Sequence, residues 1–323
     1  MKAKTVLVTG GAGFIGSHLC RHLLEEGDYV VCLDNFSSGQ AEHVEELSAF
    51  PNFRFIRADV AEEFPALHPD EIYHLACPAS PPFYQADPLQ TMKTCFLGTL
   101  NMLTLAQRCG ARLLFTSTSE VYGDPEVHPQ KEDYWGHVNP CGIRSCYDEG
   151  KRIAEAMLFD ADRRQLADVR VVRLFNTYGP GMRDDDGRVV SNFIMQALKG
   201  EDLTVFGGGT QTRSLCYIDD TVRALLSMMK QDDFAGPVNI GNPEEVAVRQ
   251  IAEEVIALTG SHSSIVHRPL PSDDPVRRKP DIARARKYLH WEPTVSRAEG
   301  LKRTIEYFRS ISETDRSRRN QNV

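Results

Sequence analysis

The chain has 323 residues, of which 41% are hydrophobic, and a formal net charge of −8. This length supports one large or two moderate domains with a well-buried core, and an acidic chain without a dense basic stripe is a poor match to duplex nucleic acid. No apolar run reaches the length of a membrane span, and Thr5–Val8 follows the first four residues without a signal sequence. We therefore expect a cytoplasmic protein that binds neither nucleic acid nor membranes.

Strand-like apolar runs alternate with helical patterns through the first half of the chain. The predicted strands are 5–8, 29–33, 53–57, 72–75, 112–117 and 169–175, and the main predicted helices are 14–26, 89–109 and 145–164. Such alternation is typical of a parallel sheet with helices on both faces. We predict an α/β fold with a doubly wound, Rossmann-type sheet over residues 1–176.

After residue 176 the pattern loosens into loops, short strands and helices. We predict strands at 215–218 and 238–240 and helices at 190–199, 220–230, 248–258 and 297–310. Residues 177–313 are expected to form mainly a smaller C-terminal α/β lobe, in which the proline-rich link 269–280 is a loop over a cleft. The polar residues 314–323 predict a disordered tail.

Eight cysteines occur without a Cys-x-x-Cys motif or regular spacing. They lie mostly among apolar residues, so we expect buried free thiols rather than disulfides or a zinc site. His18 and His22 are four residues apart, but neither a third ligand nor an intervening Glu accompanies them. We predict no bound metal.

A glycine-rich turn joins the first predicted strand to the first predicted helix. Gly11–Gly16 reads Gly-x-Gly-x-x-Gly, and Gly10 extends it to Gly-x-x-Gly-x-x-Gly. These glycines permit a tight turn and let a pyrophosphate approach the N–H groups at the helix N-terminus. The second strand ends at Asp34, where a carboxylate accepts bonds from a ribose and repels a 2′-phosphate. We predict NAD rather than NADP, with Asp59 as either an adenine contact or a turn residue.

Tyr147 and Lys151 stand four residues apart in a predicted helix. Side chains at this spacing share a helix face, so we expect Lys151 to lower the pKa of the Tyr147 phenol. Thr118 ends a predicted strand, at the sheet edge where ligands bind in such folds, and can share a substrate hydrogen bond with Tyr147. A tyrosine tuned in this way can take a proton from a sugar hydroxyl while a nicotinamide accepts the hydride. The three residues predict redox chemistry at an alcohol carbon.

Five motifs resemble those of the extended short-chain dehydrogenase/reductases that act on nucleotide sugars. They are Cys77–Pro81, Thr116–Gly123, Arg144–Arg152, Gly187–Phe193 and Arg277–Asp281. Within that family the chain is most similar to the UDP-glucuronate decarboxylases, because the pair Ser119-Glu120 follows Thr118. The 4,6-dehydratases carry Asp-Glu there, and 4-epimerases generally lack the acid.

The resemblance implies a redox-neutral reaction of UDP-glucuronate with a tightly held, catalytic NAD. Oxidation at C4 gives a 4-ketone, the C6 carboxylate leaves as CO₂, C5 is protonated, and reduction at C4 yields UDP-xylose. Thr118, Tyr147 and Lys151 would carry out the oxidation at C4. Glu120 would transfer the proton at C5 or orient a water that transfers it, and Ser119 would position the carboxylate. A salt bridge to a nearby arginine is the alternative reading of Glu120.

The same resemblance implies the residues that bind each ligand. The expected cofactor-binding residues are Gly10, Gly13, Phe14, Ile15, Gly16, Asp34, Asn35, Phe36, Ser37, Asp59, Val60, Leu75, Ala76, Tyr147 and Lys151. The expected substrate-binding residues are Ser80, Tyr84, Lys93, Asn176, Arg188, Phe206, Arg213 and Arg278. A core position for Phe206 and a surface salt bridge for Arg213 are the alternatives. A homodimer formed by helices 89–109 and 145–164 is typical of the family.

Other functions fit parts of the same pattern. A 4,6-dehydratase or 4-epimerase of a nucleoside-diphosphate hexose would share the glycine turn and the Tyr147 helix, and a 4-keto pentose is the alternative product of a decarboxylase. A protein that only senses NAD(H) would share the fold without the chemistry. The intact Thr118, Tyr147 and Lys151 argue against that last function.

Overall fold

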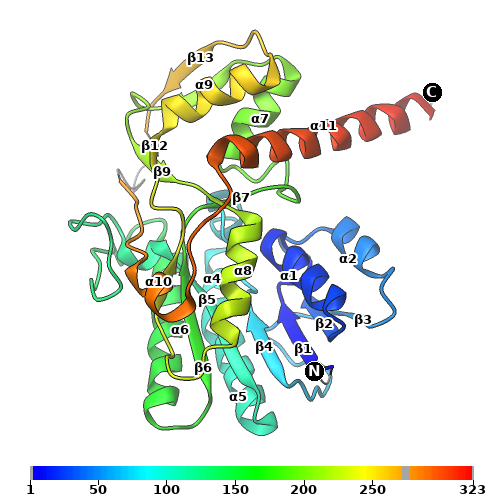
Figure 1. Ribbon diagram of the computed structural model, residues 1–323, viewed down its shortest axis with the longest axis vertical. Helices are drawn as coiled ribbons and strands as arrows, with labels where there is room; N and C mark the ends of the chain where they lie inside the picture. Colours follow the sequence, from blue (N-terminus) through cyan, green and yellow to red (C-terminus); the bar gives the residue numbers. More distant parts are fainter. Residues whose placement is uncertain (1–2, 271–276, 322–323) are drawn as a thin grey trace.

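A seven-stranded parallel sheet forms the body of the molecule in the computed structural model, which describes residues 3–270 and 277–321, with side chains as far as 312 (Figure 1). The strands lie in the order β11-β6-β5-β4-β1-β2-β3, and every adjacent pair is parallel. They are β1 (Thr5–Thr9), β2 (Tyr29–Asp34), β3 (Phe53–Arg57), β4 (Glu71–His74), β5 (Arg112–Thr118), β6 (Val169–Leu174) and β11 (Val238–Ile240). The predicted doubly wound fold is confirmed, and its strand order reverses between β1 and β4, where such sheets bind ligands.

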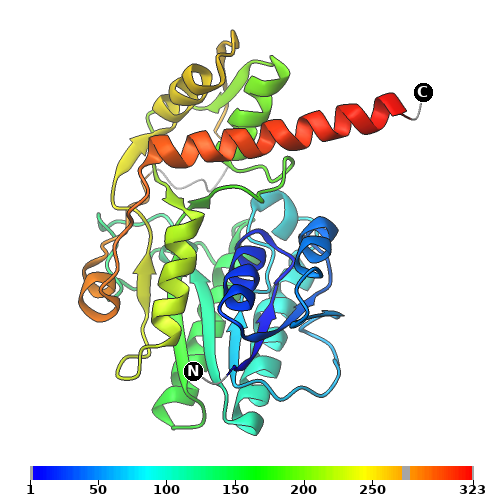
Figure 2. The same cartoon turned by 45° about the vertical axis from the view of Figure 1, so that its right-hand side comes forward.

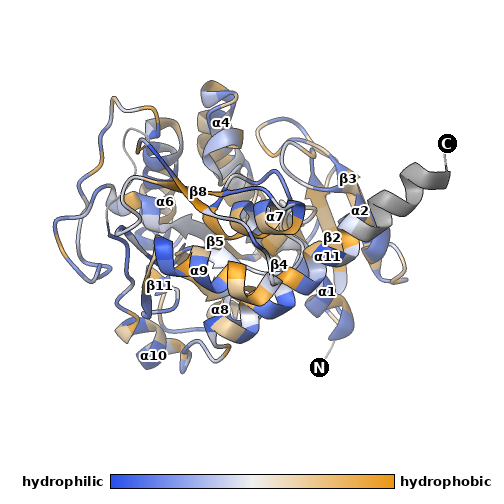
Figure 3. Cartoon of the chain, turned by 90° about the horizontal axis from the view of Figure 1, so that it is seen from above, coloured by the Kyte–Doolittle hydropathy of each residue, from blue (hydrophilic) through white to orange (hydrophobic). Residues whose placement is uncertain are grey.

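Alternate side chains of the central strands point to opposite faces of the sheet. Val6 and Val8 of β1 pack in one buried cluster, and Leu7 packs in another. The first face is covered by α1 (Phe14–Glu25) and α8 (Ile218–Met229), and the second by α5 (Thr99–Cys109) and α6 (Ser145–Arg163). Figure 3 shows hydrophobic strand segments enclosed by helices of mixed hydropathy. Burial on both faces explains why these strands read as continuous apolar runs.

The predicted helix 89–109 is present as one continuous helical stretch with a wider turn inside it. It comprises α4 (Pro88–Lys93), the π-helical turn η1 (Thr94–Gly98) and α5. Three short helices near the sheet edge were not predicted, because they are too brief to show a periodic pattern. They are α2 (Ala41–Leu47), α3 (Pro81–Tyr84) and the 3₁₀ turn η2 (Ser119–Tyr122).

A smaller lobe lies beyond the carboxyl ends of the strands, at the top of Figure 1. It contains α7 (Val189–Lys199), α9 (Val248–Thr259), the parallel pair β8 (Leu203–Phe206) and β13 (Ile265–Arg268), and the antiparallel pair β9 (Thr212–Ser214) and β12 (Glu245–Ala247). A third short pair joins β7 (Thr177–Tyr178) to β10 (Cys216–Tyr217). Between these elements, α8 packs on the main sheet, β11 pairs with β6, and α10 (Ala283–Leu289) lies against β11. Residues 177–313 therefore build the lobe and also complete the sheet.

The C-terminal helix α11 (Arg297–Gln321) differs from the sequence prediction. It runs across the molecule and its end projects beyond the body (Figure 2), through most of the tail that the sequence predicts to be disordered. No proline or glycine follows Gly300 before the helix ends, so nothing in the backbone stops it. Of the predicted cleft-covering link, residues 271–276 lie outside the described part of the chain.

The structure also bears on the expectations for the cysteines, for membrane-spanning helices and for metal ligands. All eight cysteines are free, most are buried, and Cys141 is exposed. Across residues 3–270 and 277–321, no helix combines the length and the apolarity that a membrane crossing requires. The same residues contain no group of three or more potential metal ligands.

The buried Asp220 ties the link before α11 to the first turn of α8. Its carboxylate accepts bonds from the Thr294 N–H at 2.9 Å, the Thr294 hydroxyl at 2.8 Å and the Val295 N–H at 2.9 Å. Its backbone carbonyl accepts the indole N–H of the buried Trp291 at 2.9 Å. The carboxylate therefore satisfies three donors that no local structure would satisfy.

We predict that Asp220→Ala lowers the free energy of unfolding by about 3 kcal/mol, because it leaves buried donors without an acceptor. Urea unfolding followed by circular dichroism measures this change. The adjacent Asp219 is exposed, so Asp219→Ala is the matched control and should change stability by less than about 0.5 kcal/mol. Equal losses in the two variants would contradict the role of Asp220.

Candidate active site

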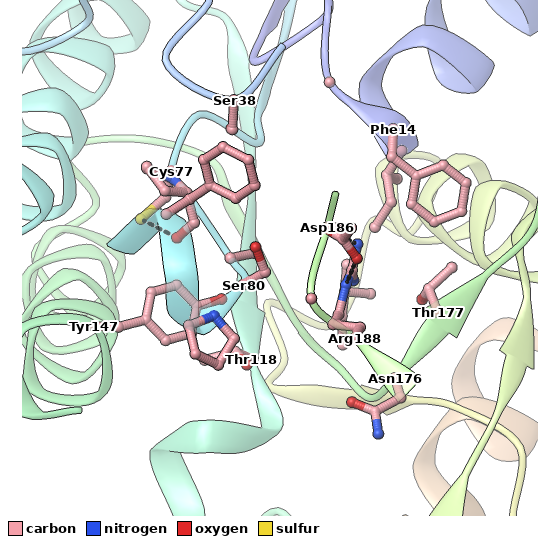
Figure 4. Close-up of a pocket in the computed structure, with 18 of the residues that line it drawn as sticks. Phe14, Ser38, Cys77, Ser80, Thr118, Tyr147, Asn176, Thr177, Asp186 and Arg188 are labelled. Atoms are coloured by element: carbon pink, nitrogen blue, oxygen red, sulfur yellow. Dashed lines mark hydrogen bonds and ion pairs between the residues drawn. The ribbon is translucent and has the colours of Figure 1, made fainter. Parts of the chain in front are cut away.

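A cavity of about 560 Å³ lies between the carboxyl edge of the sheet and the smaller lobe. Its walls come from the loops after β1, β2, β4, β5 and β6 and from α7, β8 and α9. Figure 4 shows two groups of side chains facing each other: Cys77, Ser80, Thr118 and Tyr147 on one side, and Phe14, Asn176, Thr177, Asp186 and Arg188 on the other. The cavity occupies the position at which strand order reverses, as expected for a doubly wound sheet.

The glycine turn brings the N-terminus of α1 against the end of β1. Gly10 has φ of +71°, and a Cβ there would lie 2.9 Å from the Ala76 nitrogen. A Cβ on Gly16 would lie 2.1 Å from the Gly10 carbonyl oxygen. Only glycine fits at these two places, so the first turn of α1 can approach the strand end closely. The N–H groups of that first turn form a cradle suited to a pyrophosphate.

Asp34 ends β2 beside this turn, and its carboxylate is fixed by the backbone. It accepts bonds from the Ala12 N–H at 3.0 Å and the Phe36 N–H at 2.8 Å. Burial raises the pKa of Asp34, and these backbone bonds oppose that rise. A carboxylate has about four acceptor positions, so Asp34 retains acceptor capacity on the cavity side.

The predicted cofactor-binding residues line this cavity with one exception. Those that line it are Gly10, Gly13, Phe14, Ile15, Gly16, Asp34, Asn35, Ser37, Asp59, Val60, Leu75, Ala76, Tyr147 and Lys151. Asp59 also accepts bonds from Asn35 at 2.9 Å and Gln90 at 3.0 Å, which fix its orientation. Phe36 does not line the cavity, because its ring packs against Phe55 with centroids 5.1 Å apart. The sequence missed this because the left-handed Phe36 backbone, at φ +63°, sets the direction of the ring.

Tyr147, Lys151 and Thr118 are brought together as predicted. Thr118 hydrogen-bonds to the Tyr147 hydroxyl. The Lys151 ammonium donates to the Thr116 carbonyl at 2.8 Å and lies 5.9 Å from the centre of the Tyr147 ring. Behind Tyr147, the ring of Tyr84 stacks in parallel at 5.0 Å. The helix α6 and the end of β5 thus place the phenol, the ammonium and the hydroxyl at one point.

The electrostatics of Tyr147 correct one expectation. The sequence predicts that Lys151 lowers the phenol pKa, but in the structure the pKa of Tyr147 lies well above its ordinary value of 10. Burial is the main cause, the charge of Cys77 adds to it, and the Thr118 bond opposes both. Tyr147 is therefore a neutral phenol in the protein alone, and further positive charge is needed to ionise it.

Glu120 lies between two arginines at the start of η2. It accepts bonds from Arg278 at 2.8 Å and Arg144 at 2.5 Å. Burial raises its pKa, but Arg278 and then Arg144 outweigh burial and lower the pKa of Glu120 to about 2. Arg278 is itself buried and donates to Ser119 at 2.9 Å and to the Gly123 carbonyl at 2.8 Å. The salt bridge weighed as an alternative for Glu120 is present, and Glu120 is ionised at neutral pH.

Two residues beside this cluster were not singled out from the sequence. Arg144 lies three residues before Tyr147, a spacing that puts both on one face of a helical segment and could have identified it. Asp148 is buried, and one of its oxygens has no hydrogen-bond partner. Burial, and then the charge of Glu120, raise the pKa of Asp148 to about 7. The raised pKa of Asp148 depends on tertiary contacts, and no pattern in the sequence predicts it.

Most predicted substrate-binding residues also line the cavity. They are Ser80, Asn176, Arg188, Phe206, Arg213 and Arg278. The core alternative for Phe206 does not hold, because its side chain is 41% exposed. Tyr84 is buried behind Tyr147, and Lys93 is exposed on the outer face of α4. Gln90 of α4 and Thr94 at the start of η1 turn inward instead, and neither Tyr84 nor Lys93 reaches the cavity surface.

Comparison with known proteins bears directly on this site. The model of the NAD dependent epimerase/dehydratase family matches residues 6–241, which contain the glycine turn, Thr118, Tyr147 and Lys151. The chain belongs to this family. NAD is the cofactor of this chain, and its glycine turn fits that role because Gly10 and Gly16 leave no room for a side chain.

Two relatives of this chain are UDP-glucuronic acid decarboxylases. UDP-glucuronic acid decarboxylase 1 of Danio rerio is 54% identical over 94% of this chain and 72% of its own length. UDP-glucuronic acid decarboxylase 5 of Arabidopsis thaliana is 54% identical over 94% of this chain and 89% of its own length.

Solved structures share the fold at lower identity. UDP-glucose 4-epimerase of Thermotoga maritima has a TM-score of 0.88 and 33% identity, covering 95% of this chain and 99% of that one. UDP-glucuronic acid 4-epimerase of Bacillus cereus, in complex with UDP-glucuronic acid and NAD, has a TM-score of 0.86 and 28% identity over the same shares.

Proposed function

We propose that this chain decarboxylates UDP-glucuronate to UDP-xylose, with NAD reduced and reoxidised within one turnover. The observation that carries the proposal is the 54% identity, over 94% of the chain, to UDP-glucuronic acid decarboxylases of an animal and a plant. The two solved 4-epimerases are 33% and 28% identical. One of them holds UDP-glucuronic acid and NAD together, so a fold of this shape accommodates both.

The buried charges near Ser119 support a sugar acid as the substrate. Arg144 and Arg278 carry two positive charges, and Glu120 carries one negative charge between them. The adjacent Asp148, with a pKa of about 7, adds part of a second negative charge, so the cluster keeps a net positive charge of less than one unit, which attracts a carboxylate in a site of low dielectric. A neutral hexose, as a 4-epimerase or 4,6-dehydratase of UDP-glucose would bind, gains nothing from this charge.

The first chemical step is proton removal from the C4 hydroxyl. Tyr147, once ionised in the holoenzyme, accepts that proton, and Thr118 donates a hydrogen bond to the same oxygen, since both face the cavity and already share a bond. Lys151 supplies positive charge behind the phenol. Bound NAD⁺ would supply the acceptor for the C4 hydride and a positive charge that would oppose the raised pKa of the phenol.

Loss of CO₂ follows because the carboxylate is then β to a ketone. Electrons from the broken C5–C6 bond flow into the C4 carbonyl, whose oxygen receives the proton held by Tyr147 and a bond from Thr118. Ser119 and Arg278 orient the carboxylate before it leaves. Glu120 is ionised, so it accepts protons rather than donating them. We therefore assign Glu120 to orienting the water that protonates C5.

The function is tested by incubating the purified protein with UDP-glucuronate and following the products by proton NMR. We expect loss of C6 as CO₂ and formation of UDP-xylose, without net consumption of NAD⁺. UDP-glucose is the matched control substrate, since it lacks only the carboxylate, and it should remain unchanged. Conversion of UDP-glucose to UDP-galactose with UDP-glucuronate untouched would exclude the decarboxylase.

A second prediction separates oxidation at C4 from the later steps. Glu120→Gln should still oxidise C4, so bound NADH should accumulate in its absorbance band while release of UDP-xylose falls at least tenfold. Tyr147→Phe lacks the base, so it should form no NADH, and turnover should fall by about 10²–10⁴. The exposed Glu126 provides the control variant Glu126→Gln, which should behave as wild type. Absence of NADH in Glu120→Gln would assign Glu120 to oxidation or binding instead.

We also propose that the chain forms a homodimer through the helical stretch α4–η1–α5 and α6. Large apolar side chains are exposed along one side of this stretch, namely Leu89, Met92, Phe96, Leu97 and Leu100, with Ile153 on the neighbouring α6. Contiguous apolar surface of this kind marks protein interfaces.

A cytoplasmic location is supported by eight free cysteines, which a reducing compartment preserves.

Phe96→Glu should convert the dimer to a monomer, because it would bury a charge in each half of the interface. Sedimentation velocity measures the mass. Leu258→Glu, a similarly exposed position on α9 in the other lobe, is the control and should leave the mass unchanged. A monomeric wild type would exclude the proposal.

A further inference from the structure

Two cysteines from different elements meet beside Tyr147. Cys77 lies in the loop after β4 and lines the cavity, and Cys95 is buried in η1. Their sulfur atoms are 3.4 Å apart. A disulfide bond measures about 2.0 Å, so the two sulfurs need to approach by about 1.4 Å to form one.

The surrounding packing holds this pair together. A Cβ on Gly150 of α6 would lie 3.0 Å from both the Cβ and the sulfur of Cys95, so α6 packs directly against Cys95. Cys77 packs against the cluster of Tyr84, Cys146 and Tyr147. In Figure 4, Cys77 and Tyr147 lie next to each other on one side of the cavity.

The two thiols have unequal reactivity. The hydrogen bond with Cys95 lowers the pKa of Cys77, burial opposes it, and the positive charge of Lys151 lowers the pKa further. The same bond and burial raise the pKa of Cys95 well above its usual value. The thiolate is the nucleophilic form of cysteine, and Cys77 alone of the two lines the cavity. Cys77 is therefore the nucleophilic thiol of the pair, and Cys95 is the thiol next to it that stays protonated.

We propose that Cys77 is a site of reversible oxidation by peroxide, that Cys95 is its resolving thiol, and that their disulfide switches the enzyme off. The Cys77 sulfur attacks one peroxide oxygen, the O–O bond breaks, and the departing hydroxide takes a proton to become water. The Cys95 sulfur then attacks the Cys77 sulfenic acid, the S–O bond breaks, and a second water leaves with the Cys95 proton. Two thiols and one hydrogen peroxide thus give one disulfide and two waters.

Formation of the disulfide disturbs the cofactor side of the cavity and the position of the Tyr147 phenol. Cys77 continues directly from Leu75 and Ala76, which line the cofactor part of the cavity, and it packs on the phenol of Tyr147. Drawing Cys77 toward Cys95 displaces this wall by a large fraction of an ångström. A misplacement of about 1 Å at a reacting group costs about 10²-fold in rate. We therefore expect turnover to fall more than tenfold.

The holoenzyme with bound NAD is treated with hydrogen peroxide, and remaining thiols are alkylated before peptide mass spectrometry. We expect a peptide pair linked through Cys77 and Cys95, formed in step with the loss of turnover, and full recovery of activity after dithiothreitol. The linkage is measured without substrate, so its result is distinguishable from failure of the decarboxylase proposal. A linked pair with unchanged turnover, or peroxide inactivation without the link, would overturn the switch.

Two variants complete the test. Cys95→Ser should keep the activity of the reduced enzyme, since Cys95 does not line the cavity, but it should form no linked pair and lose the recovery by dithiothreitol as Cys77 oxidises further. Cys141→Ser removes the exposed cysteine and should respond to peroxide as wild type does. Full recovery in Cys95→Ser, or protection in Cys141→Ser, would contradict the assignment.

Discussion

The buried ion pair between Arg278 and Glu120 joins the two parts of the molecule that form the cavity. Arg278 donates hydrogen bonds to Ser119, Glu120 and Gly123, although it lies 159 residues after Ser119 in the sequence. Removal of Glu120 would leave both arginines without their shared partner, which is costly in a protein interior, whereas removal of Arg278 would leave Glu120 paired with Arg144 alone. Backbone bonds between Gln130 and the strand-like residues 279 and 281 support the same contact. One interaction thus closes the cavity and sets its charge.

The redox groups and the acid-binding groups share the same two elements. The end of β5 carries Thr118 and continues directly into Ser119 and Glu120, and the start of α6 carries Arg144 and Tyr147. The proposed decarboxylation requires this proximity, because the arginines would hold the carboxylate while the phenol and the threonine act on the C4 hydroxyl of the same sugar. This proximity also explains why burial dominates the pKa of Tyr147, since the dry site that strengthens the ion pair also penalises a phenolate.

Two residues that the family resemblance implied do not line the cavity, and the reason is physical. The direction of the Lys93 side chain is set by its helix face and that of the Phe36 ring by its backbone angle, and neither is fixed by position along the chain. Tyr84 lies behind Tyr147 and stacks on its ring without lining the cavity. The pairing of Arg144 with Glu120 and the raised pKa of Asp148 depend on the packing of α6 against η2, because Glu120 comes from the other element.

The sequence by itself determined the features that depend on near neighbours. The glycine turn, Asp34 at a strand end and the Tyr147–Lys151 spacing are local patterns, and apolar runs buried on both faces define the strands of a parallel sheet. The tertiary structure alone decided the pairing of Glu120 with two arginines, the contact of Cys77 with Cys95 and the raised pKa of Tyr147. Each of these depends on burial and on distances between residues remote in the chain, which no local pattern encodes.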